Sequence, residues 1–200
     1  MASSLFYRLE QEAFRAGIQA RTDEARTWFR QKVKELGVVN RQQLLKDEAL
    51  IRKQRTMAGQ MYMYFYDPKH RETLPYYDMF PLTIMVQKAP GGFYGLNLHY
   101  LKPTTRAHFL DQLADTMSND KYDDSTKFRI RYNLLNGVQK YREFRPCFKH
   151  YLSAHIDSRI VMVQPPEWEI AIFLPTEQFA KAKKNEVWKD SYKIARGLSL

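Results

Sequence analysis

The segment "MYMYFY" at residues 61–66 alternates tyrosine with methionine or phenylalanine. Successive side chains of a β-strand point to opposite faces, so the tyrosines would share one face and Met61, Met63 and Phe65 the other. At least one of these rows must pack into a core. Tyrosine has an apolar ring and a polar tip, so we interpret the tyrosine row as structural, at the rim of a small barrel. A partly wet groove that stacks against a partner is the alternative.

Four further segments are short, rich in aromatic and β-branched residues, and bounded by turn formers, which is typical of strands. The turn residues at 90–92 would join two of them as a hairpin. We therefore predict a sheet of about five strands, at residues 60–66, 80–86, 93–101, 159–164 and 167–175.

Three helical patterns precede this region. Apolar residues recur at helical spacing over residues 4–20, and residues 22–37 begin with Thr22 as a candidate N-cap and end on a glycine. A third helix is predicted over residues 40–55, with Asn40 as its cap. Further helices are predicted from Pro103 onward and over residues 123–141, 147–156 and 176–200.

This order of elements predicts an α+β fold: a small antiparallel, barrel-like sheet of about five strands with packed helices. We divide the chain into a helical N-terminal arm, residues 1–58, and an α+β core domain, residues 59–200.

The charge of the chain is strongly unbalanced. Lys and Arg number 32 against 22 Asp and Glu, for a formal net charge of +10. A basic surface gains affinity for nucleic acid by releasing its condensed counterions, so polyanionic partners are favoured. The single cysteine, Cys147, excludes an internal disulfide framework and fits a reducing cytoplasm. The sequence shows neither a bilayer-length apolar run nor a secretory start, so we expect no membrane partner.

Catalytic signatures are weak. The glycines near residue 91 lack the Lys-Ser/Thr of a phosphate-binding loop. Cys147 and His150 could share a helix face, as in a thiol enzyme, but free cysteine is more often a small buried hydrophobe. A metal-dependent nuclease built on Asp67, Asp78 and His99 is the main enzymatic alternative, and no compact ligand motif supports it. We therefore predict no enzyme activity and no cofactor.

No recognition-helix or zinc-finger pattern appears, which disfavours sequence-specific readout. If DNA is bound, phosphate contacts from clustered cations are the expected means. For each of these residues a solvated helix face is the ordinary alternative. The candidates are Arg41, Arg52, Lys53, Arg55, Lys69, His70, Arg71, Lys181, Lys183 and Lys184.

Three stretches resemble one known family. They are "MYMYFYDPKHRETLPYYDMFPLTIMV", "GGFYGLNLHYLKPTTRAHFLDQL" and "PEWEIAIFLPTEQF". They are similar to the DNA end protector proteins of T-even-like tailed myoviruses, and the similarity covers most of the chain. The resemblance implies a minor virion protein, made in the host cytoplasm, that caps the ends of packaged linear double-stranded DNA against host exonuclease. It carries over no binding residue.

The residues leave a second function open. The chain could be a structural piece of the phage neck, tail or baseplate. In that case the N-terminal amphipathic helices would dock onto other virion proteins, and aromatic strands would form the contacts.

Overall fold

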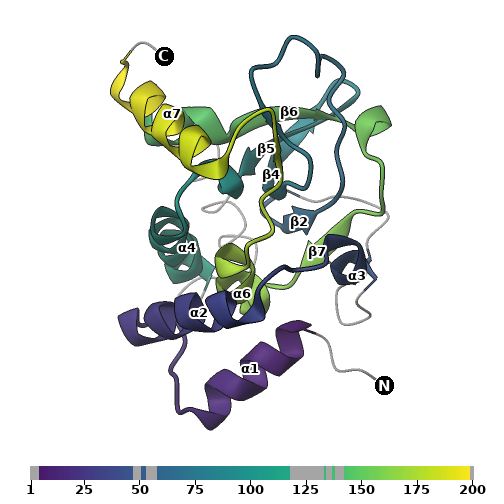
Figure 1. The fold of residues 1–200 in the computed structure, drawn as a ribbon. Helices are drawn as coiled ribbons and strands as arrows, with labels where there is room; N and C mark the ends of the chain where they lie inside the picture. The colour runs from purple at the N-terminus through teal and green to yellow at the C-terminus, as the bar shows by residue number, and fades with distance from the viewer. Residues whose placement is uncertain are drawn as a thin grey trace.

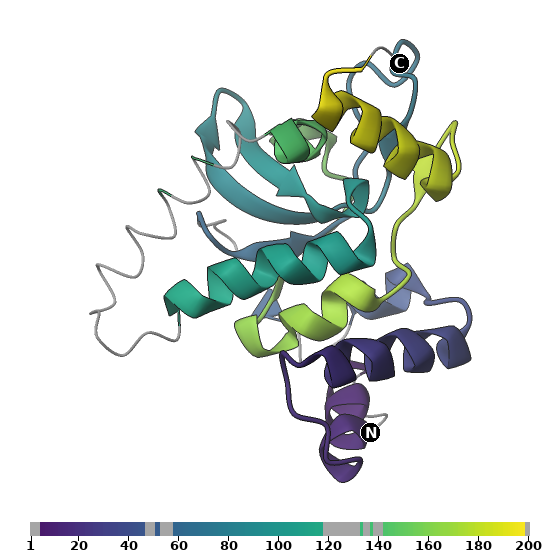
Figure 2. The ribbon, with the colours of Figure 1, turned by 90° about the vertical axis from the view of Figure 1, so that its left-hand side faces the viewer.

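The computed structural model describes residues 5–46, 51–52, 58–117, 133, 137 and 142–198. Its centre is an antiparallel sheet with helices packed along one side (Figures 1 and 2). The six strands, in spatial order, are β1 (Ile51–Arg52), β7 (Val161–Val163), β2 (Met61–Met63), β4 (Leu82–Ala89), β5 (Gly92–Asn97) and β6 (Phe148–Leu152). A separate pair joins β3 (Tyr77–Asp78) to β8 (Phe179–Ala180).

The α+β class is confirmed, but the barrel is wrong. The order of the described strands begins at β1 and ends at β6, and these two are edges rather than partners. The sheet also has one strand more than predicted, because β1 and β6 are added at its edges and the strand predicted at residues 167–175 is absent from it. The hairpin is confirmed, since β4 and β5 pair antiparallel around the turn at residues 90–92.

Glycine is required beside that turn. A Cβ at Gly92 would lie 1.8 Å from the backbone oxygen of Tyr151 on β6. Only a residue without a side chain lets β5 and β6 approach this closely.

The two faces of β2 enter different cores. Met61 and Met63 join the large apolar cluster that also contains the helices. Tyr62, Tyr64 and Tyr66 form a second cluster with residues of β4, β5, β6 and β7, and Tyr64 is completely buried. The rings of Tyr64 and Tyr151 meet edge to face, with centroids 5.5 Å apart. The tyrosine row is therefore structural, as predicted, but it belongs to a second buried cluster rather than to the rim of a barrel, and these rings do not line a groove.

The N-terminal helices are α1 (Leu5–Arg15), α2 (Asp23–Leu36) and α3 (Arg41–Leu45). The cap of α2 is confirmed, because Thr22 Oγ1 accepts a hydrogen bond from the backbone N–H of Ala25 at 3.0 Å. Helix α3 is much shorter than predicted, since residues 51–52 pair with β7 instead of continuing a helix. Arg52, one of the cations predicted near the C-terminus of this helix, therefore lies in a strand.

Two other predictions are wrong, each because tertiary packing rather than the local pattern decides the structure. Residues 167–175 form a helix, α6 (Trp168–Phe173), rather than a strand, and residues 147–156 contain β6 rather than a helix. Five of the six residues of α6 are buried, so no polar face marks its helical period. In β6, the apolar residues fall at spacing that resembles a helix, and pairing with β5 overrides it.

The remaining helices are α4 (Pro103–Met117) and α7 (Lys184–Arg196). The start of α4 at Pro103 is confirmed, whereas α7 begins later than predicted, after β8. The helix predicted over residues 123–141 lies outside the described residues, apart from positions 133 and 137. Figure 2 shows α4 and α6 next to the sheet and α2 beyond α6, on the side away from the sheet.

The helical side shares one core with the sheet. Phe6 and Leu9 of α1 and Phe29 of α2 belong to the same buried cluster as Ile84 of β4. The rings of Phe29 and Phe173 stack with centroids 6.4 Å apart, which joins α2 to α6. The division into an arm, residues 1–58, and a core, residues 59–200, stays a prediction.

Candidate nucleic-acid interface

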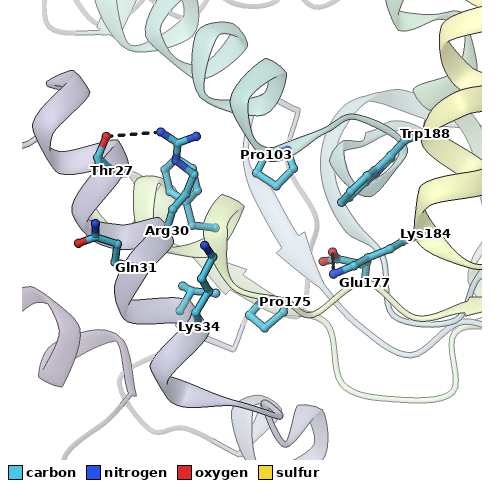
Figure 3. A pocket seen from close by; sticks show the side chains of 11 residues that line it. Thr27, Arg30, Gln31, Lys34, Pro103, Pro175, Glu177, Lys184 and Trp188 are labelled. Carbon is cyan, nitrogen blue, oxygen red and sulfur yellow. Dashed lines mark hydrogen bonds and ion pairs between the residues drawn. The ribbon is translucent and has the colours of Figure 1, made fainter.

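A cleft of about 340 Å³ opens between α2 and α7. Helix α2 forms one wall and α7 the other, with prolines from two further segments between them (Figure 3). We refer to it as the α2–α7 cleft. The side chains that matter for its chemistry are Arg30, Lys34, Pro103, Pro175, Lys184 and Trp188.

The α2 wall is cationic. Arg30 and Lys34 lie four residues apart, so they share one face of the helix. Both are exposed, and Arg30 donates a long hydrogen bond of 3.4 Å to Thr27 Oγ1 on the same helix. Figure 3 shows both cations on the side of the cleft opposite Trp188. This wall therefore presents two positive charges to anything that enters.

The α7 wall is aromatic. Trp188 is half-buried, and its indole Nε1–H donates to the backbone oxygen of His99 at 2.9 Å. The Arg106 guanidinium lies 5.9 Å from the ring centroid and Lys184 Nζ lies 5.7 Å from it. The hydrogen bond fixes the plane of the indole, so the ring is a rigid apolar surface at the cleft.

A buried ion pair lies beneath this wall. Arg106 is completely buried and donates to the backbone oxygens of Leu101 and Ile172 at 2.8 and 3.0 Å. Its guanidinium is 3.9 Å from Glu177 Oε2, and the other carboxylate oxygen, Oε1, accepts from Lys184 Nζ at 3.1 Å. Burial alone would raise the pKa of Glu177, but the nearby positive charges, first that of Arg106, lower it. Glu177 therefore stays ionised and holds Lys184 at the cleft.

Arg41, a predicted contact residue, has a structural role. Its guanidinium donates to the backbone oxygens of Thr176 and Glu177 at 2.8 and 3.0 Å. Burial lowers the pKa of Arg41, although the charges of Asp78 and Glu177 oppose this. The side chain ties α3 to the segment that forms the floor of the α2–α7 cleft.

Residues 67–74 form the second cationic region, which we call the basic loop. Arg71 pairs with Asp67 Oδ2 at 2.8 Å and with Glu72 Oε1 at 3.3 Å. Lys181 Nζ donates to three loop carbonyls, those of Arg71, Glu72 and Leu74, at 2.5, 3.0 and 3.2 Å. The fold thus brings together two regions that were predicted separately. Much of their charge is satisfied by these internal partners.

The other predicted cations are dispersed. Lys69 and His70 are exposed at the tip of the basic loop, and Lys183 is exposed just before α7. Lys184 is the predicted candidate that lines the α2–α7 cleft. Arg52 belongs to strand β1, while Lys53 and Arg55 lie outside the described residues.

The candidate contact residues predicted from the sequence do not include Arg30, Lys34 or Trp188. The cations had a visible signal, their four-residue spacing on a predicted helix, but nothing in the sequence showed which helix they would face. Trp188 comes from the other end of the chain, so its placement depends on the tertiary fold.

The three residues considered for a nuclease do not form one group. Asp78 and His99 are together and buried, with Asp78 Oδ2 2.7 Å from His99 Nδ1, while Asp67 lies in the basic loop. Asp78 also accepts hydrogen bonds from the Asn97 amide and from the backbone N–H of Phe80. Its carboxylate therefore links elements of the fold. Within the described residues, no three acidic, histidine or cysteine side chains form a group that could hold a metal.

The cysteine does not resemble a nucleophile. Cys147 is buried, and burial raises the pKa of its thiol to about 12, so it stays protonated at neutral pH. His150 lies on strand β6, with Nε2 3.1 Å from the backbone oxygen of Pro90. The two residues do not share a helix face as predicted.

None of the described helices is both long enough and apolar enough to cross a bilayer.

Comparison with known proteins gives one result. A family model described as the phage T4 terminal DNA protecting protein matches residues 8–192. Searches among curated proteins and among solved structures find no match. The matched range runs from α1 into α7 and includes both walls of the α2–α7 cleft. The resemblance to DNA end protector proteins is therefore confirmed, and the chain belongs to the phage T4 terminal DNA protecting protein family.

Proposed function

We propose that this protein is a non-enzymatic virion component that binds the ends of packaged linear double-stranded DNA and shields them from host exonuclease. The family match supports the end-protecting role. The observation that supports a specific site is the α2–α7 cleft, which sets two cations opposite a fixed indole.

Each part of this cleft suits a DNA end. Cations at its mouth attract phosphates by releasing counterions, and this attraction is independent of sequence. An aromatic face stacks on a base, which is exposed at an end but covered by neighbours inside a duplex. The combination distinguishes an end from the interior without reading sequence, which agrees with the lack of a recognition-helix pattern.

The experiment is a binding titration of the full chain at several salt concentrations. One probe is a blunt linear duplex, and the other is the same duplex closed by hairpins at both ends. We expect tighter binding to the open duplex, weakening with salt, and slower exonuclease digestion of that duplex. Equal binding to both probes, with unchanged digestion, would contradict the proposal.

A structural role in the neck, tail or baseplate is the second candidate, and exposed apolar residues near the N-terminus favour it. Phe14 of α1 is 79% exposed and Val38 is 92% exposed. Such residues are suited to contacts with other virion proteins. This role predicts that Phe14→Ser and Val38→Ser reduce incorporation into particles while leaving DNA-end binding of the purified protein unchanged.

A further inference from the structure

The size of the α2–α7 cleft limits what it can hold. Its volume of about 340 Å³ is near the lower end of the range for small-molecule pockets, roughly 300–1,000 Å³. A complete base pair brings two nucleotides, one from each strand, so a space of this volume suits a single nucleotide better. A single nucleotide is of the right scale.

The arrangement of the lining also matches one nucleotide. Trp188 contributes its indole ring to the lining, with Lys184 Nζ over the ring at 5.7 Å, and Pro103 and Pro175 lie between it and α2 (Figure 3). Arg30 and Lys34 stand on the opposite wall, where a phosphate attached to that base would lie. Aromatic stacking combined with cations along the backbone is the usual chemistry of single-strand binding.

The acidic residue in the lining does not oppose a phosphate. Glu177 is paired with Lys184 at 3.1 Å and lies 3.9 Å from the buried Arg106. Its charge is therefore matched within the wall. The charge left facing the cleft is that of Arg30 and Lys34.

The wall is also prepared before anything binds. The hydrogen bond from Trp188 to His99 fixes the indole, and the Glu177 carboxylate holds Lys184 beside it. A fixed aromatic surface loses little conformational freedom on binding, which favours affinity.

We propose that the α2–α7 cleft captures one unpaired nucleotide from a frayed DNA end, with its base on Trp188 and its phosphate between Arg30 and Lys34. This inference rests on the proposed end-binding function and deepens it. Unpairing costs least where a base is terminal or mismatched, so capture of a frayed nucleotide would itself select ends. No bond is made or broken.

The test compares three duplexes, each closed by a hairpin at one end. The open end carries a complementary terminal pair, a terminal mismatch, or a terminal pair covalently crosslinked between the strands. A fourth duplex is closed at both ends. We expect the mismatched end to bind about tenfold more tightly than the complementary one, and the crosslinked end at least about tenfold more weakly. A 2-aminopurine at the terminal position should also change fluorescence when the base leaves the duplex.

Variants identify the site. Trp188→Leu should remove the difference between mismatched and crosslinked ends, whereas Trp188→Phe should keep most of it because a ring remains. Lys189→Ala is the matched control, since this lysine is exposed on α7 and does not line the cleft. If Trp188→Leu does not fold, Arg30→Ala and Lys34→Ala provide the same comparison at exposed positions.

The outcomes separate this inference from the proposed function. If the crosslinked end binds as tightly as the mismatched end, and the doubly closed duplex binds much more weakly, ends are recognised without nucleotide capture. The inference is then wrong and the proposed function stands. If none of the open ends binds better than the doubly closed duplex, both are wrong.

Discussion

The basic loop and the α2–α7 cleft are both cationic, but their charges are used differently. In the basic loop, Arg71 faces two carboxylates and the Lys181 ammonium is surrounded by three carbonyl oxygens. In the cleft, Arg30 and Lys34 project from one helix toward an opening. The loop cations are therefore held by carboxylates and by carbonyls of the loop, whereas Arg30 donates to two neutral oxygens of its own helix, those of Arg26 and Thr27.

The difference shows that a cluster of cations along the sequence does not by itself mark a binding surface. What matters is how many internal acceptors each cation meets after folding. A lysine that donates to several backbone oxygens keeps its charge, but it must give up those hydrogen bonds before it can contact a phosphate directly. The predictions below test this contrast, beginning with the largest expected effect.

The buried pair under the cleft should dominate stability. Glu177→Gln leaves the completely buried Arg106 without its counter-charge, so the free energy of unfolding should fall by about 3 kcal/mol, measured by urea denaturation at pH 7. Glu72→Gln, which breaks an exposed pair of the basic loop, should cause no measurable change. An equal loss in both variants would contradict the contrast.

The same pair predicts a pH dependence. The pKa of Glu177 is lower in the folded protein than its ordinary value of 4.5. The ionised carboxylate therefore stabilises the fold fully above about pH 4.5, and this contribution disappears as the pH falls through the lower folded pKa. Glu177→Gln should lose less stability between pH 6 and pH 3 than the wild type does, as followed by denaturation at each pH.

Reversing the charge of the cleft should have the next largest effect. Arg30→Glu combined with Lys34→Glu should weaken binding to open duplex ends by about 100-fold and reduce the salt slope by about 2, because two phosphate contacts are lost. Lys69→Glu combined with His70→Glu, at the exposed tip of the basic loop, should weaken it by less than about threefold. The opposite ranking would place the DNA on the basic loop.

Removing the aromatic surface should have a moderate effect. Trp188→Leu should weaken end binding by about tenfold, since stacking of one base contributes roughly 1–3 kcal/mol. Tyr192→Leu is the control on the same helix, because Tyr192 is exposed but does not line the cleft. A similar loss for Tyr192→Leu would mean that α7 contributes only a general aromatic surface.

The smallest effect is expected from the lysine that holds the basic loop. Lys181→Met removes three hydrogen bonds to loop carbonyls, so the free energy of unfolding should fall by about 1 kcal/mol. Limited proteolysis within residues 67–74 should become faster. End binding should stay within about twofold of wild type, and a larger loss would show that the basic loop contacts DNA.

The sequence predicted those elements whose signals are local. The cap at Thr22, the hairpin at residues 90–92 and the start of α4 at Pro103 all depend on a few neighbouring residues. The alternation at residues 61–66 also specified two faces correctly. Elements whose form depends on distant partners were not predictable, such as the buried α6 and the edge strand β6.

The candidate site shows the same limit. Composition predicted a polyanionic partner, and the resemblance predicted the family. The cleft forms only when α2, the segment from Phe173 to Glu177 and α7 come together in the tertiary fold. Of the eight predicted contact residues that the structure describes, Lys184 lines the cleft.

The most direct measurement is photocrosslinking of the full chain to a duplex with one photoreactive thymine, placed either at the end or in the middle, followed by mass spectrometry of the joined peptides. Our account predicts end-dependent crosslinks to peptides within residues 23–36 and 184–196, the two walls of the α2–α7 cleft. Crosslinks to the basic loop, or equal crosslinking by terminal and internal thymines, would contradict it.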